Sequence, residues 1–89
     1  MKKEIISTNP AKGYEEVGRV NMSTEAEVSL AVQKAHKAFF AWRNLSITER
    51  GVYFEKLAAL LQKNTEEIAL MQTREMGKPI RDSRAEVSG

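Results

Sequence analysis

The sequence predicts a mainly α-helical fold that begins with a short β-hairpin. Turn residues separate two strand-like runs between residues 4 and 20, helix-capping signatures recur further on, and a Gly-Lys-Pro triplet interrupts the last helical run. With 89 residues, the chain suits one small domain or a piece of a larger one.

The hairpin is expected over residues 4–20. Residues 4–8 favour a strand, and residues 9–13 contain the Pro and Gly that favour a turn. The chain then returns with Val17 and Val20 as its apolar members. A two-stranded hairpin is marginally stable alone, so we expect this one either to dock on another element or to fray.

The first helix is expected over residues 24–43. Thr24 and Glu27 have the spacing of a capping box. Successive residues lie about 100° apart on a helix, so the apolar residues of this segment form one stripe. The stripe consists of Val28, Ala31, Val32, Ala35, Phe39 and Trp42.

Two further helices are expected over residues 47–63 and 65–76. Ser46 and Glu49 form a second capping box, and the apolar residues after it cover a wide arc that indicates more than one neighbour. The run 64–67, Asn-Thr-Glu-Glu, repeats the capping signature and predicts that the chain bends or restarts there.

A fourth helix is expected over residues 79–88. Gly77 is typical of the residue that ends a helix, and Pro79 is typical of the first position of the next one. A phosphate-binding loop is excluded, because Gln72 stands where it needs Gly and Pro79 where it needs Ser or Thr. The sequence stops soon after this helix begins, which we interpret as a truncation.

Composition excludes several classes of function. The net charge of +2 is weak for a nucleic-acid binder, and no apolar run is long enough to span a membrane or act as a secretory signal. We therefore expect a cytoplasmic protein. Cysteine is absent, and His36 is the only histidine, so zinc sites of the usual kind are excluded. The five glycines do not form a dinucleotide-binding fingerprint.

Residues with chemical potential have structural interpretations that we favour. His36 suits a structural or solvated role better than that of a general base. Phe39, Phe40 and Trp42 are expected in a core rather than stacked on a nucleotide base. Lys78 is expected to cap or to be solvated, with phosphate contact as the alternative. Ion pairing or a solvated face is expected for the basic residues Arg74, Arg81 and Arg84, with an anion site as the alternative.

The order of these features resembles the N-terminal part of the aldehyde dehydrogenase superfamily. The similar pieces are Asn9-Pro10-Ala11-x-Gly13, Val28-x-x-Ala31-Val32 with Ala35, Ala38-Phe39-x-x-Trp42, Glu49-Arg50, Leu57-Ala58-x-Leu60-Leu61, residues 67–70, Glu75-Met76-Gly77-Lys78-Pro79 and Ala85-Glu86-Val87. Residues 73–80 look most like the succinate-semialdehyde dehydrogenase branch. Phe40 departs from the family pattern, which often has proline or a polar residue there.

The resemblance implies a place in a larger enzyme. Residues 1–89 would be the N-terminal part of a nucleotide-binding domain, a fragment of an α/β fold whose helices pack around the nucleotide-binding sheet. Such enzymes oxidise aldehydes to carboxylic acids with NAD⁺ or NADP⁺, using a cysteine nucleophile, a glutamate that activates water and an asparagine that holds the oxyanion. None of these can be placed in this chain. We therefore expect no catalytic, cofactor-binding or metal residue among the 89, no bound cofactor and no activity of this segment alone.

The resemblance also bears on partners. The expected partner is the remainder of the same polypeptide, in an enzyme that forms a homo-oligomer, with no nucleic acid and no membrane. Some family members hold a structural monovalent cation, and the matching groups here would be the Thr8 main chain and Glu86. The alternative to this interpretation is an autonomous helical protein-interaction module, in which four capped helices form a small bundle.

Overall fold

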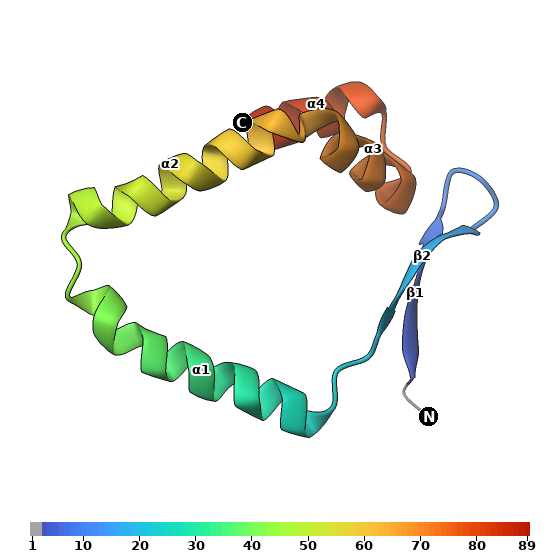
Figure 1. Cartoon of the computed structure of the whole chain (residues 1–89). Coiled ribbons are helices and arrows are strands. Elements are labelled where there is room, and N and C mark those ends of the chain that lie inside the picture. Colours follow the sequence, from blue (N-terminus) through green and yellow to red (C-terminus); the bar gives the residue numbers. More distant parts are fainter. Residues whose placement is uncertain (1–2) are drawn as a thin grey trace.

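A computed structural model describes residues 3–89. Figure 1 shows a hairpin followed by four helices that run around an open-sided ring. The elements in chain order are β1 (Glu4–Asn9), β2 (Glu15–Asn21), α1 (Glu25–Arg43), α2 (Ile47–Lys63), α3 (Thr65–Met76) and α4 (Ile80–Ser88). The predicted fold class, mainly helical with an N-terminal hairpin, is therefore confirmed.

The hairpin is antiparallel and carries one irregularity. Its register pairs Glu4 with Asn21, and it shifts between Ser7 and Thr8. The turn is closed by the Asn9 carbonyl, which accepts hydrogen bonds from the Lys12 N–H at 3.2 Å and the Tyr14 N–H at 2.8 Å. The chain reverses direction within residues 10–14, so the end of β1 and the start of β2 lie together beside α3.

Side-chain caps start the two long helices. The Thr24 hydroxyl accepts a hydrogen bond from the Glu27 N–H at the start of α1. At the start of α2, Ser46 and Glu49 form the full capping box, with both reciprocal hydrogen bonds at 3.1 Å. These contacts satisfy N–H groups that the first turn of a helix leaves without partners.

The junction between α2 and α3 differs from the expectation. The chain does restart there, but Asn64 makes no side-chain cap for α3. Its Nδ2 donates instead to the Leu60 carbonyl at 2.8 Å, and the Thr65 hydroxyl donates to the Leu61 carbonyl at 3.0 Å. Both side chains therefore stabilise the end of α2, where carbonyls would otherwise lack donors.

The Gly-Lys-Pro triplet separates α3 from α4. Gly77 adopts the left-handed conformation at φ +73°, and its N–H donates to the Thr73 carbonyl at 2.8 Å. Pro79 precedes the first helical residue rather than occupying it, and its carbonyl accepts from the Asp82 N–H at 3.0 Å. The expected start at residue 79 is thus one residue early, within the usual uncertainty of a helix end.

The described chain does not enclose a core. Within residues 3–89, Ala69 is the one buried hydrophobic residue, and none of the residues of α1 or α2 is buried. The radius of gyration is 17.5 Å, whereas a compact chain of this length has about 12 Å. The four helices therefore do not form the bundle that an autonomous module would need.

Candidate functional site

Two turns that are far apart in sequence meet in space. A Cβ built on Gly77 would lie 3.0 Å from Pro10 Cγ and 3.3 Å from the Ala11 nitrogen. The Asn-Pro turn of the hairpin therefore packs directly against the end of α3. Of the two outcomes expected for the hairpin, docking and fraying, the structure shows docking on α3.

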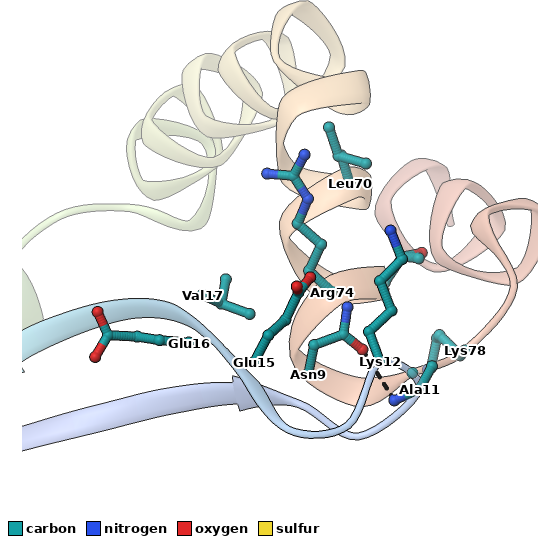
Figure 2. Close-up of a pocket in the computed structure, with 11 residues that line it drawn as sticks. Asn9, Ala11, Lys12, Glu15, Glu16, Val17, Leu70, Arg74 and Lys78 are labelled. Carbon is teal, nitrogen blue, oxygen red and sulfur yellow. Dashed lines mark hydrogen bonds between the residues drawn. The ribbon is translucent and has the colours of Figure 1, made fainter.

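The hairpin side of this junction is held by Asn9, which is buried with only 5% of its surface exposed. The Asn9 Oδ1 accepts a hydrogen bond from the Ala11 N–H at 2.9 Å, drawn as a dashed line in Figure 2. This Asx turn orients Pro10 and Ala11 toward Gly77. A second contact comes from Ser7, whose hydroxyl donates to Glu75 Oε2 at 2.9 Å.

A hollow of about 400 Å³ lies between the hairpin and α3. Charged side chains of both signs line it, as Figure 2 shows: Lys12, Glu15, Glu16, Arg74 and Lys78. The anion-binding capacity of its cations is opposed by the two carboxylates. The hollow therefore holds three cations and two carboxylates side by side rather than a cluster of one charge.

Lys78 belongs to a polar network across the turn between α3 and α4. Its Nζ lies 2.6 Å from Glu86 Oε1, and its side chain is 25% exposed. Gln72 Nε2 donates to the other carboxylate oxygen of Glu86. The hydrogen bond from Lys78, followed by that from Gln72, lowers the pKa of Glu86. Lys78 therefore pairs with Glu86 across the turn, instead of capping a helix or standing fully solvated as expected.

The cation hypothesis for Thr8 and Glu86 gains no support from this geometry. Both carboxylate oxygens of Glu86 already accept hydrogen bonds, one from Lys78 and one from Gln72. Within residues 3–89, no group of three or more His, Asp or Glu side chains is arranged to hold a metal ion.

Two residues that sequence reasoning missed contribute to the contact between α3 and α4. Ser83 is fully buried, and its hydroxyl lies 2.8 Å from the Thr73 hydroxyl. A serine among charged residues gives no signal of burial, because its small size fits both a solvated face and a close helix contact. The close approach of the two helices explains why a small residue stands at this position.

The arginines of this region do not form a common anion site. Arg84 makes two hydrogen bonds to Glu66, at 2.7 and 3.2 Å, which joins α4 to α3. Arg81 lies 3.7 Å from Asp82, and Arg74 lines the hollow described above. The ion-pairing interpretation therefore holds for Arg84, whereas Arg81, whose side chain is 90% exposed, fits the solvated face.

Of the three α1 aromatic residues expected in a core, Trp42 is half-buried, whereas Phe39 and Phe40 are exposed. Phe39 is 50% exposed and Phe40 45% exposed. The Arg43 guanidinium lies over both rings, 5.6 Å from the centroid of Phe39 and 5.1 Å from that of Phe40. The expectation of a core fails for these rings because residues 3–89 contain no element packed across this part of α1.

His36 and Trp42 also have structural neighbours. His36 contacts Phe40 edge-on, with ring centroids 5.1 Å apart. Trp42 meets Tyr53 of α2 at 5.3 Å and Phe54 at 6.5 Å. No carboxylate orients His36 among the described residues, and the contact favours the structural role that we preferred for it. Trp42 instead packs against α2 beside the turn that joins α1 to α2.

No helix within residues 3–89 combines the length and apolarity that crossing a membrane requires. The described chain presents a docked hairpin, a tight α3–α4 pair and a large exposed apolar surface on α1 and α2.

A sequence profile of the aldehyde dehydrogenase family matches residues 1–89, and the chain belongs to that family.

Individual relatives point to semialdehyde dehydrogenases. The chain is 42% identical over 80 residues to an α-ketoglutaric semialdehyde dehydrogenase of Bacillus subtilis, covering 90% of this chain and 16% of the relative. It is 38% identical over 84 residues to an N-succinylglutamate 5-semialdehyde dehydrogenase of Legionella pneumophila, covering 94% and 17%. It is 37% identical over 87 residues to a 1-pyrroline-5-carboxylate dehydrogenase of Bacillus pumilus, covering 98% and 17%. The chain thus spans about one sixth of the length of these relatives.

Proposed function

We propose that residues 1–89 are the N-terminal segment of the nucleotide-binding domain of an NAD(P)-dependent aldehyde dehydrogenase, with a structural role and no activity alone. The observation that carries the proposal is the exposed apolar surface of a chain that belongs to this family. Large hydrophobic residues stand exposed along both long helices, including Val32 at 63% and Phe54 at 61%. Such continuous apolar surface is rare on a protein that needs no partner.

The chemistry of the proposed enzyme is supplied from outside these residues. Oxidation of an aldehyde to an acid by covalent catalysis needs a nucleophile, and the cysteine that the family resemblance implies is absent from this sequence. The carboxylates of the hollow beside Arg74 oppose binding of a nucleotide there. The contribution of this segment is to present α1 and α2 as a surface on which the rest of the domain packs.

The names of the relatives support a substrate class. Two of them are named for aldehydes that also carry carboxylates, α-ketoglutaric semialdehyde and N-succinylglutamate 5-semialdehyde. We propose a carboxylate-bearing aldehyde as the substrate, with succinate semialdehyde, oxidised to succinate, as the particular prediction. We also propose a homo-oligomer for the full enzyme and a cytoplasmic location.

A segment exchange tests the structural role. The matching 80-residue stretch of the Bacillus subtilis relative is replaced by the corresponding stretch of this chain, and aldehyde oxidation is followed as NAD(P)H absorbance. We expect the hybrid enzyme to keep activity within about tenfold of the parent, because many hydrophobic positions tolerate substitution when volume and pattern are kept. The matched control hybrid carries Gly77→Val, which should disrupt the contact with Pro10 and lower the yield of active enzyme.

The 89-residue chain is assayed beside the hybrid with NAD⁺, NADP⁺ and succinate semialdehyde. We expect no turnover. A soluble but inactive hybrid would contradict the proposed segment role, and robust turnover by the 89-residue chain alone would contradict its proposed inactivity.

A further inference from the structure

The apolar stripe of α1 has no neighbour over most of its length within the described chain. The α1 stripe is the set Val28, Ala31, Val32, Ala35, Phe39 and Trp42. Val28 is 53% exposed, Val32 63% and Phe39 50%. Trp42 contacts α2 at the C-terminal end of the stripe. A chain on its own therefore leaves a helix-long apolar surface in water, which is costly.

The chain exposes more surface than a compact protein of its mass. The chain exposes 7649 Å², while a compact protein of 10.0 kDa exposes about 5,200 Å². The excess is roughly 2,400 Å² per chain, and stable homodimers bury about 2,000–5,000 Å² from both partners together. This excess is spread over the whole open chain, and the exposed apolar residues of the α1 stripe supply part of it. A net charge of +2 per chain opposes the approach of two copies only weakly.

The charges of α1 favour one orientation of two copies. Glu25 and Glu27 lie in its first turn, whereas Lys34, Lys37 and Arg43 occupy its second half. An antiparallel pair would place the acidic end of each helix beside the basic end of the other, and a parallel pair would place like charges together.

One pair of charges is especially well placed. At about 100° per residue, Glu25 and Arg43 flank the same edge of the stripe. Neither has an ion-pair partner within residues 3–89, and the Arg43 guanidinium is kept beside the stripe by its contact with Phe39. In an antiparallel pair centred near residue 34, Glu25 of each copy faces Arg43 of the other.

We propose that the 89-residue chain, when it is not joined to the rest of an aldehyde dehydrogenase, forms an antiparallel homodimer along the α1 stripe. The occupant of the stripe is then a second copy of this chain. The proposal goes beyond the enzymatic role above and is independent of the substrate, because it concerns the isolated chain alone.

Sedimentation velocity over a hundredfold range of concentration tests the dimer, with the emission of Trp42, the only tryptophan, as a second readout. We expect a reversible monomer–dimer equilibrium and a shift of the Trp42 emission to shorter wavelength as the dimer forms. Val32→Glu should abolish the dimer. Leu30→Glu is the matched control, because Leu30 is 57% exposed on the opposite face of α1 and should leave association unchanged.

Charge exchange tests the orientation. Glu25→Lys alone and Arg43→Glu alone should each weaken association about tenfold, because each creates two like-charge contacts in the dimer. A mixture of the two variants should recover the affinity of the unchanged chain. In the mixed dimer, both contacts between position 25 of one copy and position 43 of the other join a base to a glutamate. The recovery separates pairing from any loss of helix stability in the single variants.

Three results would overturn the proposal. They are a monomer at every concentration, equal effects of Val32→Glu and Leu30→Glu, and a mixture of charge variants that associates no better than either one. An active hybrid enzyme combined with a monomeric isolated chain would reject the dimer and leave the proposed enzymatic role intact.

Discussion

At the scale of single residues, Gly77 carries two requirements at once. Its φ of +73° is a conformation that residues with a Cβ rarely adopt, and a Cβ there would lie only 3.0 Å from Pro10 Cγ and 3.3 Å from the Ala11 nitrogen, so the hairpin would have to shift by a few tenths of an ångström. The two turns of the molecule therefore depend on each other at one position. Glycine is needed there for the backbone of α3 and also for the docking of the hairpin.

Gly77→Ala should lower the free energy of unfolding by about 1–3 kcal/mol, because the left-handed conformation and the contact with Pro10 both become unfavourable. Urea unfolding followed by circular dichroism measures the change. Gly51→Ala is the matched control. Gly51 lies inside α2 with open space around it, so that change should stabilise the helix by roughly 0.5–1 kcal/mol. We expect opposite signs for the two variants, and a stabilising Gly77→Ala would contradict the account.

Glu86 gives the α3–α4 pair a dependence on pH. The hydrogen bonds from Lys78 and Gln72 lower the pKa of Glu86. The contribution of Glu86 to the stability of the folded state is therefore present above the ordinary pKa of a glutamate. It is lost as the pH falls through the lowered pKa. Between about pH 5 and pH 3, the helicity of the unchanged chain should fall more than that of Glu86→Gln. Glu55→Gln serves as the control for loss of one carboxylate, and it should titrate like the unchanged chain. Parallel acid curves for Glu86→Gln and the unchanged chain would show that the network does not stabilise the fold.

At the scale of elements, each long helix begins at a side-chain cap, but neither helix packs closely against another element of the described chain. Thr24 starts α1 and the Ser46–Glu49 box starts α2. Because neither helix buries a residue within the described chain, local signals contribute an unusually large share of their stability.

Ser46→Ala should therefore cost about 1 kcal/mol, seen as fraying of the first turn of α2 and a loss of ellipticity at 222 nm. Ser46→Asp should restore most of the helicity, because its carboxylate also accepts from the N–H groups of the first turn. If the two variants lose the same helicity, the cap is not what holds this end of the helix.

The difference between local capping signals and contacts across the fold explains which features could be predicted from the sequence. Helix starts and the Gly-Lys-Pro break were predictable because capping and turn preferences act over a few residues. The docking of Pro10 on Gly77 and the burial of Ser83 were not, because nothing near either residue indicates the contact partner. Asn64 misled the prediction because its side chain can serve either the helix before it or the helix after it, and it serves α2.

At the scale of the whole molecule, the exposed aromatic rings and the open shape have one explanation. The apolar pattern of α1 and α2 is that of buried helices, but the elements that would bury Phe39 and Phe40 are not among residues 3–89. The chain spans about one sixth of the relatives named above. The proposed packing of the rest of the domain on α1 and α2 would account for their exposed apolar surface. That no catalytic residue lies among the 89 stays a prediction, which the assay of the isolated chain tests.

The most direct test of this account is small-angle X-ray scattering of the Val32→Glu chain, extrapolated to zero concentration so that association does not contribute. The open arrangement predicts a radius of gyration near the 17.5 Å of the structure. A value of about 12 Å would mean that the helices collapse into an autonomous bundle, and a value of about 30 Å would mean that the chain is unfolded. Either of these would contradict the central claim that residues 3–89 hold an open surface ready for the rest of an aldehyde dehydrogenase.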